Sequence, residues 1–133
     1  MLKAIAHFIA NNTSFTYGTT IQYGWRPQDA PDTCHTVLET GPSPPKFYTP
    51  TKIDKMIQVL SRSKSYNTAR TGAVEIFDFL VGAAGWELPE IVAGKKYFAM
   101  VIEPSSAPQY IGMDDKKRHE FSTNYLFKLR TRT

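Results

Sequence analysis

The sequence predicts an α+β fold, in which a mainly antiparallel sheet of about five strands carries two helices packed on one face. Three observations support this prediction. An alternating segment, Ile53–Leu60, is followed at once by residues with helical periodicity. Near the end of the chain, residues 118–130 alternate between apolar and polar side chains. The predicted strands and helices are grouped along the chain, which favours α+β over an alternating α/β arrangement.

Length and composition predict one domain over residues 1–133. The 15.0 kDa chain is long enough for a single core, and an apolar share of 41% with 13% aromatic residues argues against disorder. The single cysteine, Cys34, excludes an internal disulfide. We do not expect the first ten residues to be a signal peptide, and no run approaches the roughly 20 apolar residues of a membrane span. We therefore expect a soluble protein that is made in a cytoplasm.

The N-terminal part is predicted to form one helix and two strands. Apolar residues at offsets of three and four place a short helix before Asn11–Asn12. Ile21–Trp25 alternates and is expected to be the first strand, and Thr33–Thr40 the second. The prolines of Gly41–Pro45 cannot donate ladder hydrogen bonds, so we expect a surface loop there.

The central part is predicted to be a strand followed by the longer helix. The strand covers Ile53–Leu60, and the helix runs from about Ser65, which suits an N-cap, to Leu80. Gly82 and Gly85 are placed where a helix would stop. One helical face is apolar and is expected to lie on the sheet: Ala69, Ala73, Ile76, Phe77 and Leu80.

The C-terminal part is predicted to contain two strands after a linker at residues 86–90. Tyr97–Ile102 is apolar on both faces, which is typical of a strand in the centre of a sheet or at a subunit contact. The last strand alternates, with Leu126 as the exception. One face holds His119, Phe121, Thr123, Tyr125, Phe127 and Leu129, and the other is largely polar and basic.

The net charge of +4 is unevenly distributed. Sixteen Lys and Arg residues oppose twelve Asp and Glu residues, and many of the cations fall near the C-terminus: Lys116, Lys117, Arg118, Lys128, Arg130 and Arg132. Such a segment can contact nucleic acid or an acidic neighbour. The interpretation that we favour is a solvated strand edge protected by charge.

Motifs for catalysis or cofactor binding are weak. Ser61–Lys64 has the Ser-x-x-Lys spacing of some acyl-transfer enzymes, but it lies at a strand end and lacks the partner motifs. Asp114–Asp115 could bind a cation, although a charged turn explains it more simply. Cys34 would need a base supplied by the fold. We therefore predict no enzyme activity and no cofactor.

The three histidines have no metal-ligand spacing, so no metal site is predicted. His7 lies on the N-terminal helix, and His35 follows Cys34 in a predicted strand. We expect both to pack in the sheet or in an interface.

Two segments together resemble the tail terminator proteins of long-tailed bacteriophages, which are also described as minor capsid or tail completion proteins. One is Val59–Tyr66 with the helix face that follows it, and the other is Pro108–Tyr125. Pro31–Asp32 before a strand and Glu39–Gly41 at its end are similar to the same pattern. The resemblance spans nearly the whole chain. The sequence departs from the pattern at 116–117, where two lysines replace a small or glycine-containing turn.

The resemblance implies a structural virion protein of the tail or neck. Such proteins form a ring, usually a hexamer, that caps the head-proximal end of the tail tube and ends its polymerisation. The implied partners are further copies of the chain, the major tail tube protein and the head-completion or connector proteins, with DNA only passing through the lumen and no membrane. The alternatives are a head–tail connector or stopper of the neck and, less well supported, a small nucleic-acid-binding module.

We predict that contacts between subunits, or with the tube, involve the basic turn at the start of the long helix. Arg62 and Lys64 lie at the junction of strand and helix, and Arg70 lies off the apolar helical face, so all three are expected to be exposed. Solvated charges without a partner are the competing interpretation. The full set of candidate interface residues is Arg62, Lys64, Tyr66, Arg70, Tyr97, Asp114 and Arg118.

Overall fold

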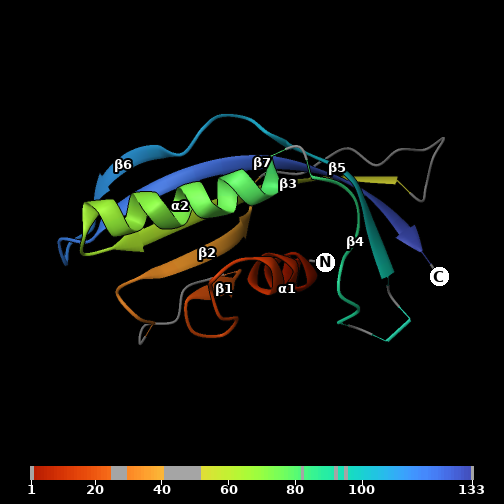
Figure 1. Ribbon diagram of the computed structural model, residues 1–133, viewed down its shortest axis with the longest axis horizontal. Coiled ribbons are helices and arrows are strands. Elements are labelled where there is room, and N and C mark those ends of the chain that lie inside the picture. Colours follow the sequence, from red (N-terminus) through yellow and green to blue (C-terminus); the bar gives the residue numbers. More distant parts are fainter. Residues whose placement is uncertain are drawn as a thin grey trace.

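The computed structural model describes residues 2–24, 30–40, 52–81, 83–91, 93–94 and 96–132 (Figure 1). Two helices and seven strands occur in the order α1 Leu2–Asn12, β1 Ile21–Tyr23, β2 Cys34–Glu39, β3 Lys52–Ser63, α2 Tyr66–Leu80, β4 Ala84–Glu87, β5 Lys96–Pro104, β6 Gln109–Met113 and β7 His119–Arg132. All strands join one mixed sheet, and every pair except β1–β2 is antiparallel. The predicted α+β class is confirmed, but the predicted number of about five strands is too low.

The two strands that the sequence did not predict are β4 and β6. All four residues of β4 are exposed, so no alternation of apolar and polar side chains marks it. β6 is short and contains Gly112, whose φ of 116° accompanies a register shift against β7. Both segments are strands because longer strands beside them offer backbone partners, which a local pattern cannot reveal.

The longest strand, β7, lies inside the sheet. On one side its residues 119–130 pair with β3. On its other side β6 pairs with residues 119–122, and β5 pairs with residues 125–132. The prediction that the basic C-terminal segment is a sheet edge is therefore wrong. Its alternation arises because Phe121, Thr123, Tyr125 and Phe127 are buried while the residues at the even positions between them are only half-buried.

The expectation for β5 is confirmed, since it lies between β7 and β4 and buries Ala99 and Ile102. Tyr97, near the start of β5, is half-buried. The proline segment 41–45 and residues 25–29 lie outside the described residues.

Helix α2 begins and ends close to its predicted limits. Ser65 is the N-cap, and its Oγ accepts a hydrogen bond from the N–H of Thr68 at 3.4 Å. The helix ends at Leu80, and the N–H of Val81 donates to the carbonyl of Phe77. Leu80 is buried as expected, whereas Phe77 is only half-buried against the core.

Both helices contribute to one core. Phe8 and Ile9 of α1 and Ile76 and Leu80 of α2 belong to the same buried cluster as Tyr125 and other inward-facing strand residues. Figure 1 shows α2 lying along β3 and β7, with α1 beside β1 and β2. Helix α2 begins near one end of β3 and β7 and ends near the middle of these long strands (Figure 1).

Candidate functional site

Five of the seven candidate interface residues come together at one end of the sheet. Here β3 turns into α2, and β6 turns into β7 (Figure 1). Ser63, the last residue of β3, pairs with His119, the first residue of β7. This register places Arg62, Lys64 and Tyr66 beside Asp114 and Arg118, which the chain separates by about fifty residues.

Arg62 is buried, with an exposed fraction of 4%, so the prediction of an exposed Arg62 is wrong. β3 continues to Ser63, whereas the sequence analysis ended it at Leu60. Arg62 therefore lies in a strand between Cys34 and Glu120 and not in a turn. Its Nη2 donates to the carbonyl of Pro31 at 2.6 Å and its Nε to the carbonyl of Asp32 at 3.2 Å. The guanidinium thereby anchors the segment that leads into β2.

Asp32 links this segment to Lys64, directly after β3, and to Arg118, directly before β7. Its carboxylate contacts Lys64 Nζ at 3.3 Å and Arg118 Nη1 at 3.4 Å. Burial alone would raise the pKa of Asp32, but hydrogen bonds and charge from Lys64 and Arg118 lower it overall. Sequence analysis did not select Asp32 for this role, because the contact with Arg118 spans 86 positions. Lys64 itself is exposed, as predicted.

The turn between β6 and β7 is built around Asp114. The Oδ1 atom accepts from the N–H groups of Lys116 at 3.0 Å and Arg118 at 2.9 Å, and Oδ2 accepts from Arg118 Nε at 2.7 Å. Burial raises the pKa of Asp114, but these donors outweigh it and lower the pKa. The expected charged turn is confirmed. Lys117 has a φ of 61°, so the turn needs a left-handed residue at one of the two positions where the sequence departs from the family pattern.

Aromatic side chains cover the start of α2 beside this turn. The Tyr66 ring lies 5.3 Å from the rings of both Tyr110 and Phe121, and 5.7 Å from the His119 ring. Tyr66 and Tyr110 each retain 44% of their surface exposed, although apolar rings of this size are usually more buried. Sequence analysis missed Tyr110, because residues 109–113 show no clean alternation.

Exposed apolar side chains continue from Tyr110 along β6. Ile111 is 53% exposed and Met113 is 58% exposed. Arg70 is one helical turn after Tyr66 and is exposed, as predicted. Tyr97 does not join this group, because it pairs with Thr131 at the other end of β7 and lies beside β4.

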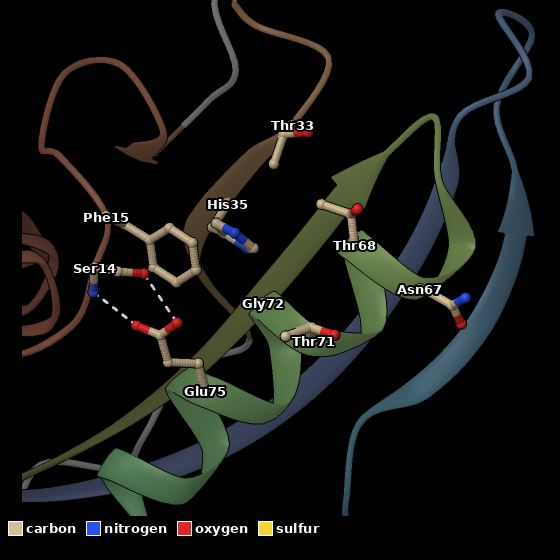
Figure 2. A pocket seen from close by; sticks show the side chains of 9 residues that line it. All are labelled: Ser14, Phe15, Thr33, His35, Asn67, Thr68, Thr71, Gly72 and Glu75. Carbon is tan, nitrogen blue, oxygen red and sulfur yellow. Dashed lines mark hydrogen bonds between the residues drawn. The ribbon is translucent and has the colours of Figure 1, made fainter.

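A separate cavity of about 350 Å³ opens between α2, the start of β2 and the segment after α1 (Figure 2). Its lining residues are Ser14, Phe15, Thr33, His35, Asn67, Thr68, Thr71, Gly72 and Glu75. Glu75 closes one side, since its carboxylate accepts from Ser14 N–H at 2.6 Å and Ser14 Oγ at 2.9 Å. The Phe15 ring packs on the His35 ring with centroids 4.1 Å apart.

His35 is fully buried beneath this cavity, which confirms its predicted packing role. Its Nδ1 shares a hydrogen bond of 2.8 Å with Ser61 Oγ, while its Nε2 has no hydrogen-bond partner among the described residues. Burial lowers the pKa of His35 to about 4, and the charge of Glu75 opposes this only in part, so the ring is neutral near pH 7. Ser61 therefore bonds to His35 and not to Lys64, and with 1% of its surface exposed it is not open to a substrate.

His7 packs differently. Its ring stacks on Tyr17 with centroids 3.8 Å apart, and burial followed by the charge of Lys3 lowers its pKa. Among the described residues, no three His, Cys, Asp or Glu side chains are grouped closely enough to hold a metal ion. In the same part of the chain, neither helix has the length and apolar character needed to cross a membrane.

The chain matches a known protein family. A family described as bacteriophage tail terminator protein matches residues 8–131 of the 133-residue chain. This range includes α2, β6, the turn at Asp114 and nearly all of β7. No curated protein matches the chain.

Proposed function

The chain belongs to the bacteriophage tail terminator family, and we propose that it forms a ring at the head-proximal end of the tail tube. In this role it is a structural virion protein of the neck that ends tail polymerisation and offers a surface for head joining. The family match over residues 8–131 is the observation that carries the proposal. The partners would be further copies of the chain in a ring of about six, the major tail tube protein and the head-completion or connector proteins.

The chain's own surface is consistent with contacts to several neighbours. Tyr66, Tyr110, Ile111 and Met113 are exposed beside the turn that Asp114 holds with its hydrogen bonds. Exposed apolar patches of this kind mark protein interaction sites in soluble proteins. We propose that Lys64, Tyr66 and Arg70 lie in or beside such a contact, with Asp114 and Arg118 shaping the turn next to it. Tyr97 would belong to a second contact, near β4.

The described residues also bear on the alternative of a nucleic-acid-binding module. That alternative depends on stacking of bases on Tyr125 and Phe127, but both rings are fully buried. We therefore propose that DNA passes through the ring lumen and that the protein does not recognise its bases. We further propose that residues 1–133 act as a single domain whose two helices cover the same face of the sheet.

A deletion of the gene in the phage, complemented from a plasmid, tests the proposal. Without the protein we expect tails of abnormal length that do not join heads, and complementation should restore both tail length and head joining. Electron microscopy of lysates gives the tail-length distribution directly. Tails of normal length that still fail to join heads would support a connector or stopper instead. Normal tails with normal joining in the deletion strain would refute a role in the neck.

A further inference from the structure

Apart from Tyr23 on β1, the exposed large apolar side chains of the described residues fall into two separate groups. The β6 patch consists of Tyr66, Tyr110, Ile111 and Met113, each 44% to 58% exposed. The β4 patch consists of Val81 and Trp86, each 43% exposed. Tyr66 is the first residue of α2 and Val81 directly follows its last, so the two patches lie at opposite ends of a 15-residue helix.

Each patch combines a residue at one end of α2 with one or more residues of an edge strand. Within the described residues β6 pairs only with β7, and β4 pairs only with β5. An edge strand leaves backbone groups without ladder partners and is accessible to another chain. Trp86 is held in place by its contacts with Phe8 and Phe79, at ring distances of 5.6 Å and 6.1 Å. The ring is thus rigid and yet partly exposed, as an interface anchor is.

The charges beside the two patches have opposite signs. Exposed Lys64, Arg70, Lys116 and Lys117 lie at the end of the sheet that holds the β6 patch, and two acids are exposed there, Asp32 and Asp115. Asp32 is already paired with Lys64 and Arg118, so cations remain in excess. The neighbouring Asp114 and Arg118 neutralise each other. The β4 patch is bordered by two exposed acids, Asp78 and Glu87. The exposed Lys96 near Glu87 is paired with Glu90 at 3.7 Å, so the acids remain in excess. Asp78 lies three residues before Val81 on the helix, and Glu87 directly follows Trp86.

We propose that the β6 patch of one copy docks on the β4 patch of the next copy, so that a repeated head-to-tail contact generates the ring. This inference rests on the proposed ring-forming function and identifies the two surfaces that would make it. A two-fold contact of the β6 patch with itself would bring the cations of both copies together. The head-to-tail contact instead places cations against acids around an apolar centre, which is the usual composition of a stable interface.

Two variants, each defective in one patch, test this arrangement. Ile111→Glu with Met113→Glu places two charges in the β6 patch and leaves the β4 patch unchanged. Val81→Glu with Asp78→Lys changes the β4 patch and leaves the β6 patch. Asn11→Glu adds a charge at an exposed α1 position outside both patches and is the matched control. Circular dichroism and thermal unfolding of each variant establish that the fold is retained.

Each defective variant alone should associate at least tenfold more weakly than wild type, on the order expected when anchor residues are lost. An equimolar mixture of the two should give dimers that grow no further, because only one intact contact is available per pair. Light scattering at high protein concentration, and electron microscopy of purified tail tubes capped with the same proteins, provide the readouts. Asn11→Glu should assemble as the wild type does.

Three outcomes would overturn the inference. Rings or capped tails from both patch variants would show that another surface makes the contact, while the terminator function would stand. Dimers of the Val81 variant alone would show that the β6 patch pairs with itself. A wild-type protein that neither forms rings in solution nor caps tubes would instead refute the proposed ring and this contact with it.

Discussion

At the scale of single residues, His35 links stability to pH. The ring is neutral, and burial lowers its pKa from 6.5 to about 4. In the unfolded chain the His35 ring has its ordinary pKa and binds a proton more readily than in the folded protein. The contribution of His35 to the free energy of unfolding is therefore fully present above pH 6.5 and is lost as the pH decreases towards 4. The shift corresponds to a loss of about 3 kcal/mol at most. Glu75 moderates this loss, since its negative charge favours the protonated ring.

Urea unfolding at several pH values measures this effect. We expect His35→Gln to reduce the pH dependence of the free energy of unfolding between pH 6.5 and 4, because it removes this titrating group. The contribution of His7, whose pKa is also lowered, should remain. The lowered pKa values of Asp32 and Asp114 act in a different window, below their ordinary value of 3.8, where their protonation removes stability. A His35→Gln protein with the full wild-type slope above pH 4 would show that another group is responsible.

Position 72 requires glycine because the His35 ring lies too close to α2 for a larger side chain. A Cβ at this position would lie 2.5 Å from His35 Cε1 and 2.8 Å from Nε2. The imidazole cannot easily move, because it is buried and bonded to Ser61. Gly72→Ala gains about 1 kcal/mol of helix propensity but loses about 1–3 kcal/mol to overpacking. We expect a net loss of stability in denaturant unfolding.

Thr71→Ala is the matched control for this prediction. It lies beside Gly72 on the same helix but is exposed, so only the helix-propensity gain should remain. If Gly72→Ala were as stable as Thr71→Ala, the close approach of His35 to α2 would not constrain position 72.

At the scale of elements, the turn between β6 and β7 contains a strained residue. Lys117 adopts a φ of 61°, which costs a residue with a Cβ about 1–2 kcal/mol. Glycine removes this strain but loses about 0.4–1 kcal/mol through the greater freedom of the unfolded chain. Lys117→Gly should therefore stabilise the protein by about 0.5–1 kcal/mol, as measured by chemical unfolding.

Lys116→Gly provides the comparison, because it removes the same charge from a position without positive φ. The control should destabilise by about 0.4–1 kcal/mol, through chain entropy alone. Equal effects of the two substitutions would mean that the turn relaxes in solution and that Asp114 does not hold Lys117 in the left-handed conformation.

At the scale of the whole molecule, the opposed charges at the two patches predict salt-sensitive assembly. Exposed charges separated by more than a few ångströms are screened progressively as the Debye length falls from about 10 Å at 0.1 M to about 3 Å at 1 M. We expect association of wild-type subunits to weaken severalfold over this range of sodium chloride. Sedimentation velocity at fixed protein concentration measures the change.

Arg70→Gln should reduce this salt dependence, since it removes one cation beside the β6 patch and leaves the apolar residues intact. Association that strengthens steadily with sodium chloride would indicate that apolar burial alone drives assembly, with no contribution from the charges.

The sequence by itself determined the elements that carry their own periodicity. The face of α2 with Ala69 and Leu80, its N-cap at Ser65 and the alternation of β7 follow from local spacing and were predicted correctly. The family was also recognisable, because ordered segments such as Val59–Tyr66 and Pro108–Tyr125 extend over most of the chain. Local patterns contain this information because each depends on residues a few positions apart.

Only the tertiary structure decided which residues are exposed at the candidate site. Arg62 is buried and donates hydrogen bonds to the carbonyls of residues 31–32, and Asp32 contacts both Lys64 and Arg118. These contacts join residues that are 30 to 86 positions apart in the sequence. β4 and β6 exist because β5 and β7 pair with them, and their exposed side chains form the two patches. Such features depend on the register between distant strands, and no residue pattern within a single segment specifies that register.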